Sequence, residues 1–192
     1  MEPSWLRYDD PGVAVEKILS AAEKAYVEVG VSKAGMATIA EFAGCSRGTL
    51  YRYFKTRHEL HIAYINRVAL EIQERIQAAV KGLNEPRERL VETILCAVRE
   101  VRQRPGAVAW FEPGISGATA RMSRSSEVIG AMSASFVGDL PNSLQRSSES
   151  RFRARWVLRV ILSLLSNPAE SEAEERIIVE RFAAPGLLSD DG

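Results

Sequence analysis

The sequence has few of the residues that mark secreted, membrane-spanning or metal-dependent proteins. Its 192 residues include two cysteines and two histidines, and 25 basic side chains balance 25 acidic ones. Cys45 and Cys96 fall in separate predicted helical regions and indicate no disulfide framework. The N-terminus carries no basic-then-apolar signal, and the longest apolar run, residues 156–165, is broken by Arg159 and Ser163. We therefore expect a cytoplasmic protein that does not enter a membrane and folds into one or two small domains.

Strand-like alternation is almost absent, whereas apolar residues recur at helical spacing through most of the chain. Capping signals predict helices that begin at Asp10 with Pro11, at Thr56 with Glu59, and at Ser171 with Glu174. Residues 105–126 hold prolines and glycines and predict a loop-rich segment with one short helix, and residues 138–148 predict a linker. The expected fold class is all-α.

The most informative segment is the polar stretch from Gly44 to Leu60. Gly44 predicts the end of a short helix that starts at Met36, and Ser46 predicts the N-cap of the next. Leu50 and Phe54 would then face inward. A helix, a three-residue turn and a second helix have the spacing of a helix-turn-helix, whose second helix enters the major groove of DNA.

The second helix of this motif presents polar, aromatic and basic side chains, and no acidic residue lies between Gly44 and Arg57. We expect Arg47 and Thr49, near its N-terminus, to read bases. Tyr51, Tyr53, Lys55 and Arg57 are placed for phosphates. The full predicted DNA-binding set is Ser46, Arg47, Gly48, Thr49, Tyr51, Arg52, Tyr53, Lys55 and Arg57.

These residues resemble the TetR family of transcriptional repressors. The resemblance rests on Ile-Leu-Ser-Ala-Ala-Glu from Ile18, Glu-Val-Gly to Gly30, Ile39-Ala40, the run from Ala43 to Tyr51, and Tyr53-Phe54. It covers about the first third of the chain. The family usually has Thr or Ser before its second helix, where this chain has Ala34 and Gly35, and Val where this chain has Cys45.

The resemblance implies an N-terminal three-helix DNA-binding domain, residues 1–56, joined to a larger helical domain, residues 57–192, that binds an effector and dimerises. It implies a homodimer that represses transcription at a palindromic operator in double-stranded DNA and leaves that operator when a small molecule binds.

The last two predicted helices are apolar enough to need burial on more than one side. A four-helix interface between two subunits would provide it. Arg159 lies inside the most apolar stretch and needs an acidic, carbonyl or ligand partner. The predicted interface comprises Trp156, Val160, Ile161, Leu164, Leu165, Ile177, Ile178 and Phe182.

The middle of the chain is expected to hold the effector, a mostly apolar small molecule, with no cofactor. Large or pliable apolar residues near the glycine-rich segment could line its cavity, although each could equally be ordinary core. The candidates are Trp110, Phe111, Met122, Met132 and Trp156, together with Arg159.

Two other functions are weaker interpretations. His58 and His61 lie three apart on a helix, but no third ligand at metal spacing accompanies them and Glu59 belongs to a cap, so neither a metal site nor catalysis is expected. Cys45, beside the reading helix, could make the protein a thiol-redox-responsive repressor.

Overall fold

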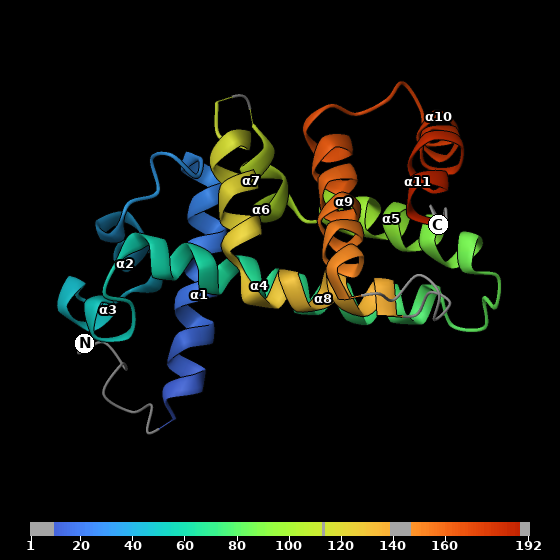
Figure 1. Ribbon diagram of the computed structural model, residues 1–192. Helices are drawn as coiled ribbons and strands as arrows, with labels where there is room; N and C mark the ends of the chain where they lie inside the picture. The colour runs from blue at the N-terminus through green and yellow to red at the C-terminus, as the bar shows by residue number, and fades with distance from the viewer. Residues whose placement is uncertain (1–9, 113, 139–146, 189–192) are drawn as a thin grey trace.

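The computed structural model describes residues 10–112, 114–138 and 147–188, and all regular elements in these ranges are helical (Figure 1). The all-α prediction is confirmed. Most of the predicted linker, residues 139–146, lies outside the described residues. In the described part, no helix is long and apolar enough to cross a membrane. The elements are α1 (Pro11–Val29), α2 (Met36–Ala43), α3 (Arg47–Tyr53), α4 (Arg57–Ala79), α5 (Pro86–Arg102), α6 (Pro105–Val108), η2 (Ala109–Phe111), α7 (Ser116–Ser125), α8 (Glu127–Gly138), α9 (Ser147–Ser166), α10 (Glu172–Ile178), η4 (Val179–Ala183) and α11 (Pro185–Leu188).

The predicted helix starts are confirmed by the capping hydrogen bonds that the structure contains. Asp10 Oδ1 accepts a hydrogen bond from the Gly12 amide at 2.8 Å, and Pro11 opens α1. The Thr56 hydroxyl accepts from the Glu59 amide at 3.1 Å at the start of α4. These caps satisfy backbone donors that would otherwise lack partners, so the local sequence alone determines where the helices begin. The Ser171 hydroxyl does the same for the Glu174 amide in α10.

The prediction of a loop-rich segment over residues 105–126 is wrong. Pro105 begins α6, because proline suits the first turn of a helix, and α7 follows the turn at Gly114. Gly106 is buried rather than flexible. A Cβ there would lie 2.5 Å from the Cγ of Glu23 and 2.5 Å from the hydroxyl of Tyr64. Glycine is needed at this position so that α6 can approach α1 and α4.

Helix α4 runs through the middle of the molecule, with α1, α2 and α3 at one end and α9, α10 and α11 toward the other (Figure 1). One apolar core joins α1–α4 to parts of α5, α6 and η2. A second core lies between α5, α9, η4 and α11. The N-terminal helices therefore share buried surface with the rest of the chain through α4.

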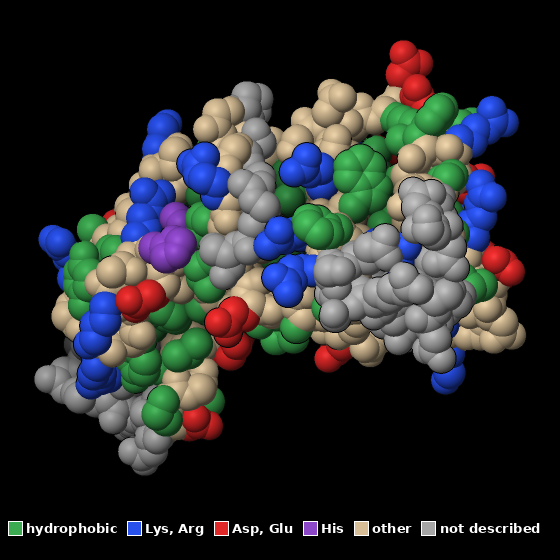
Figure 2. All heavy atoms as spheres, viewed as in Figure 1, with side chains coloured by type: hydrophobic (Ala, Val, Ile, Leu, Met, Phe, Trp, Pro, Cys, Tyr) green, Lys and Arg blue, Asp and Glu red, His purple; other side chains and the backbone are tan. Residues whose placement is uncertain are grey.

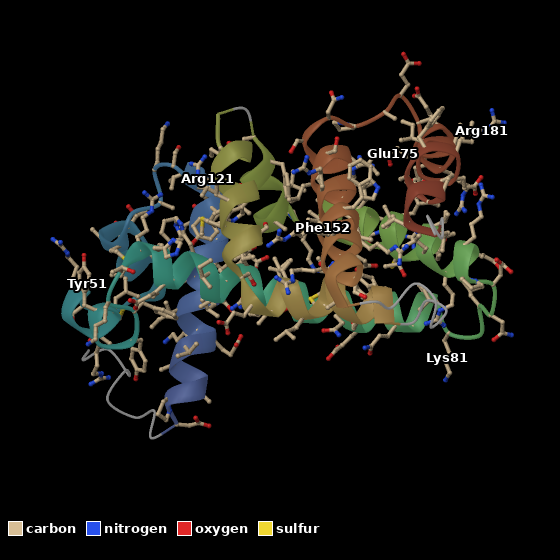
Figure 3. All side chains as sticks on the ribbon, viewed as in Figure 1. Tyr51, Lys81, Arg121, Phe152, Glu175 and Arg181 are labelled. Atoms are coloured by element: carbon tan, nitrogen blue, oxygen red, sulfur yellow. The ribbon has the colours of Figure 1, made fainter. Side chains whose placement is uncertain are left out.

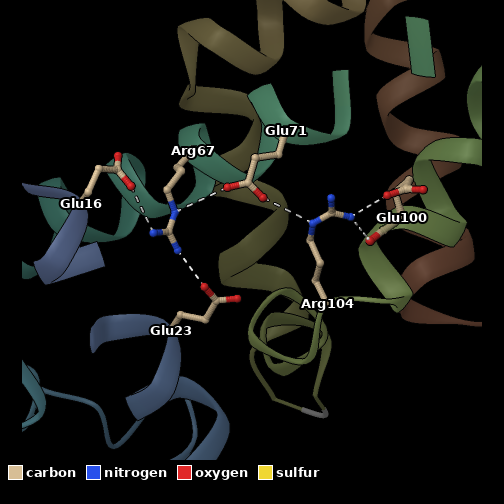
Figure 4. A network of polar contacts seen from close by, with 6 residues as sticks. All are labelled: Glu16, Glu23, Arg67, Glu71, Glu100 and Arg104. Atoms are coloured by element: carbon tan, nitrogen blue, oxygen red, sulfur yellow. Dashed lines mark hydrogen bonds and ion pairs between the residues drawn. The ribbon is translucent and has the colours of Figure 1, made fainter. Parts of the chain in front are cut away.

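A network of ion pairs holds α1 against α4. Arg67 on α4 reaches Glu23 at 2.8 Å and Glu16 at 3.4 Å, both on α1. Glu71, one turn further along α4, lies 3.9 Å from Arg67 and 3.6 Å from Arg104, which follows α5. The charges thus link three helices in series. The network comprises Glu16, Glu23, Arg67, Glu71, Glu100 and Arg104 (Figure 4).

Four rings pack beside this network, with Tyr64 and Trp110 stacked and the other contacts edge to face. Tyr26 of α1 lies 5.1 Å from Tyr64 and 5.3 Å from Trp110, measured between ring centroids, and Trp110 lies 4.8 Å from His61. His61 Nε2 accepts a hydrogen bond from Arg57 at 3.2 Å, so this nitrogen carries no proton. Burial and the positive charges of Arg57 and His58 lower the pKa of His61 from 6.5 to about 4.

Acid should destabilise the protein through His61. Between pH 6.5 and about 4 the unfolded chain protonates this imidazole and the folded chain does not, so the free energy of unfolding should fall as the pH falls. The slope from this one group should reach at most about 1.4 kcal/mol per pH unit and vanish below about pH 4. Urea unfolding of the wild type and of His61→Gln over this range measures the difference.

The control is His58→Gln, because His58 is exposed. Burial is the larger cause of the lowered pKa of His61 and His58 a smaller one, so this variant should keep most of the wild-type slope. If His61→Gln and the wild type have parallel stability curves from pH 7 to pH 4, His61 is not held neutral by the fold.

Candidate nucleic-acid interface and effector cavity

The turn between α2 and α3 has the predicted geometry. Gly44 ends α2 with φ 66°, a left-handed conformation that glycine adopts without strain, and its amide donates to the carbonyls of Ala40 and Glu41. The Ser46 hydroxyl accepts from the Thr49 amide at 3.0 Å and starts α3. Leu50 and Phe54 are buried against the N-terminal core. This packing fixes which side of α3 faces outward.

The outward side of α3 is polar and basic. Arg47, Gly48, Tyr51 and Arg52 are exposed, and so is Lys55 just beyond the helix. Tyr51 projects from this end of the molecule (Figure 3), where Lys and Arg side chains gather on the surface (Figure 2). A short exposed helix with this chemistry can enter the major groove and contact phosphates on either side.

Some of the predicted contact residues are partly engaged within the chain. The Thr49 hydroxyl lies 2.9 Å from the Ser46 hydroxyl. Arg52 donates to the Tyr53 hydroxyl at 3.2 Å, and its guanidinium carbon lies 5.1 Å from the centre of the Tyr53 ring. Tyr53 itself packs partly on the core. Arg47 has no such intramolecular contact among the described residues and remains the best candidate for base recognition.

Arg57 has a structural role besides the predicted phosphate contact, which stays a prediction. Its guanidinium donates to the carbonyls of Val31 and Ser32 as well as to His61. These bonds, made by Nε and Nη2, tie the loop after α1 to the first turn of α4. The sequence could not reveal this, because the two carbonyls lie 25 and 26 residues upstream.

The start of α2 lacks a side-chain cap. Gly35 occupies the N-cap position and no side chain accepts from the first amides of the helix, while Ala34 is fully buried. The Thr or Ser that usually precedes the second helix, and that could cap it, therefore has no substitute here. Packing has to stabilise α2 instead.

An apolar cavity of about 120 Å³ lies between α4, α5, η2, α7, α8 and α9. Trp110, Phe111 and Met132 line it, as the sequence predicts. Met122 packs on the core instead and Trp156 is 42% exposed, so the structure does not place these two on the wall. The wall residues of α4 and α9 could not be recognised from the sequence, because their periodic spacing is that of any helix core. They are Tyr64, Ile65, Val68, Ala69, Ile72, Ile76, Leu158, Ile161, Leu162 and Leu165.

The comparisons with known proteins agree with this geometry. Residues 18–64 match the family model described as bacterial regulatory proteins, tetR family. Over 188 residues the chain is 38% identical to the uncharacterized HTH-type transcriptional regulator Rv1255c of Mycobacterium tuberculosis, an alignment that covers 94% of this chain and 89% of that protein. The chain belongs to the TetR family of DNA-binding transcriptional regulators.

Two solved structures show how far the shared fold extends. The TetR family repressor AlkX from Dietzia sp. strain DQ12-45-1b has a TM-score of 0.66 at 20% identity, and the match covers 97% of each chain. RolR in complex with resorcinol has a TM-score of 0.66 at 16% identity, covering 92% of this chain and 86% of that one. TetR-family regulators are not enzymes, so membership assigns this chain to regulation, as the sequence predicts.

Helix α9 of this TetR-family regulator is divided between three surroundings, which corrects the predicted subunit interface. Val160 and Leu164 are buried in the chain's own second core. Ile161 and Leu165 face the cavity. Of the predicted interface, the side chains that the chain itself leaves well exposed are Trp156, Ile177 and Phe182.

Arg159 is exposed rather than buried, so the expected ion pair inside the apolar stretch is wrong. It lines a wide groove between α8 and α9. Cys45 gives no support to a redox function, because burial raises the pKa of its thiol above the usual value and a protonated thiol is a poor nucleophile. No group of three or more possible metal ligands occurs among the described residues.

Replacing Arg47 tests the base-reading assignment. Arg47→Ala should weaken binding to the cognate operator by about 1–3 kcal/mol and relax the preference at one position in each half-site. Binding to a panel of operator variants, measured by fluorescence anisotropy at one fixed salt concentration, gives both quantities. The matched control is Arg75→Ala, an exposed arginine far along α4, which should bind every duplex as the wild type does. Equal loss in the two variants would contradict the assignment.

Proposed function

We propose that this protein represses transcription by binding a palindromic operator as a homodimer, and that a small molecule in the apolar cavity releases it. The observation that supports this most is the position of α4. Its first turn is bonded through Arg57 to the loop between α1 and α2, and its middle turns form one wall of the cavity. A ligand that displaces α4 would therefore displace the DNA-binding helices.

Tyr64 is the closest connection between the two regions. Its ring lines the cavity, while its hydroxyl lies beside Gly106 and Glu23. The guanidinium carbon of Arg67 sits 5.4 Å from the ring centre. A ligand that pushes on this ring would act on the ion network that holds α1, so the cavity and the N-terminal helices are in mechanical contact.

Two half-sites one helical turn apart, about 34–36 Å, tolerate little change in the spacing of the two reading helices. A coupling free energy of about 1–3 kcal/mol between ligand and operator is enough to shift such a regulator from mostly bound to mostly free. A small ligand can provide this difference if it binds one conformation better than the other.

The dimer is supported by the apolar side chains that α9, α10 and η4 leave exposed. Phe152 is 67% exposed and Phe182 73% exposed, and Trp156 and Ile177 are also largely uncovered. Phe152 projects from α9 on the face shown in Figure 3, where hydrophobic side chains lie among basic ones (Figure 2). Several large apolar groups left in water on neighbouring elements are typical of a subunit interface.

Tryptophan fluorescence can test release through the cavity. A compound that releases the operator should quench Trp110, which lines the cavity, so Trp110→Phe should lose the signal. Operator duplex should weaken the affinity for that compound about 5- to 150-fold, because coupling between two ligands is reciprocal.

Trp156→Phe is the control for this titration, because Trp156 is absent from the cavity wall and its replacement should leave the quenching intact. Equal affinity for the compound with and without operator would rule out allosteric release.

Charges placed on the exposed apolar side chains should separate the dimer without unfolding the subunit. Phe152→Glu combined with Phe182→Glu should give a folded monomer, since both side chains are exposed in the isolated chain. Light scattering with circular dichroism measures mass and fold. Leu70→Glu, at an exposed leucine on α4, should remain a dimer. A dimeric double variant would exclude this surface as the interface.

A further inference from the structure

The apolar cavity adjoins a second, larger hollow of opposite character. A groove of about 1140 Å³ lies between α8 and α9, and Ser123, Ser133, Leu158 and Leu162 line both spaces. No charged side chain lines the cavity. The groove is lined by three arginines and one glutamate, together with serines. The apolar cavity thus lies against a positively charged groove, and Leu158, Leu162 and two serines form the wall between them.

The three arginines form a row. Arg151, Arg155 and Arg159 are four residues apart, which places them on one face of α9 with about 6 Å of helix rise between neighbours. All three are exposed, and no ion pair joins any of them to another described residue. Leu158 and Leu162 lie beside this row on the same helix, so the apolar wall and the cationic row are adjacent.

Two acids of α10 are engaged away from the groove. Glu175 is buried and pairs with Arg102 at 2.6 Å, and Arg102 lowers the pKa of that carboxyl. Glu174 accepts from the amide of Glu170 at 2.8 Å. Glu127, on α8, is the one acid that lines the groove, and it faces three arginines. The groove therefore keeps a net positive charge that an anion could neutralise.

We propose that the effector is an anionic amphiphile whose apolar part enters the cavity and whose carboxylate or phosphate lies in the groove against Arg155 and Arg159. This rests on the proposed function, because it specifies the ligand of the same cavity. A volume of about 120 Å³ is close to that of a cavity that accepts benzene, so the apolar part is narrow, an alkyl chain or a single ring. A charged head meets no cationic side chain among the described residues of the cavity wall, whereas three arginines line the groove.

Calorimetry on the full chain without DNA tests this with hexanoate, hexyl phosphate and 1-hexanol, whose six-carbon chains match the size of the cavity. Hexanoate or hexyl phosphate should bind at least tenfold more tightly than hexanol, and the tighter of the two anions identifies the head group. In Arg155→Gln/Arg159→Gln the anion should bind no better than the alcohol. Arg155→Lys/Arg159→Lys should keep most of the preference, because it keeps the charge.

Arg121→Gln is the matched control, since Arg121 is exposed on α7 and lines neither space (Figure 3). A second variant, Ala69→Leu, narrows the cavity and should weaken all three probes by the same factor. The arginine variants should therefore change the affinity ratio between anion and alcohol, whereas the cavity variant should lower every affinity and leave that ratio unchanged.

Equal binding of the charged and uncharged probes, or no binding of any of them, would overturn the proposal. It would also be overturned if Arg155→Gln/Arg159→Gln changed the monomer–dimer equilibrium and left the anion preference intact, because the arginines would then belong to the subunit interface. Anion binding that does not release DNA would count against the proposed function alone. Release of DNA by another compound, with no binding of these probes, would count against this ligand class alone.

Discussion

The packing of α1 against α4 is the contact on which the rest of the structure depends. Tyr26 of α1 is buried between His61 and Tyr64 of α4, and Arg67 pairs with two glutamates of α1. Aromatic packing supplies buried area and directional preference, and the partly buried ion pairs fix the helices along their length. Without this contact the DNA-binding helices would have no fixed position relative to the cavity, and binding at one site could not influence the other.

Helix α9 meets a different constraint, because one helix has to satisfy three surroundings. Successive residues of an α-helix are turned by about 100°, so residues four apart drift slowly around its surface. The stripe predicted from Phe152, Trp156, Val160 and Leu164 follows this drift: its first two members are exposed and its last two are buried in the second core. An apolar helix of this kind can belong to a core, a cavity and an external surface at once.

The predictable parts of this protein are the local ones. Caps at Ser46 and Thr56 and the left-handed turn at Gly44 involve residues within five positions of each other, so the sequence determines them directly. The helix-turn-helix and its exposed side chains followed from these signals. Predictions failed where distant parts of the chain meet: Gly106 packs against Glu23 and Tyr64, and Arg159 is exposed rather than paired inside the apolar stretch. Charge or flexibility read from sequence does not reveal which distant group a side chain meets.

The two ends of the proposed ligand would have different effects on the protein. The row of like charges on α9 costs only about 0.2–0.5 kcal/mol per neighbouring pair, so the chain can fold with it, and an anion in the groove would remove that repulsion. An anion that touched only α9 would nevertheless leave α4 where it is, because a ligand shifts a conformational equilibrium only by its difference in affinity for the two states. The apolar part must therefore reach Tyr64 and its neighbours on α4. In this arrangement the groove would supply affinity, and contact with α4 would supply the coupling to DNA.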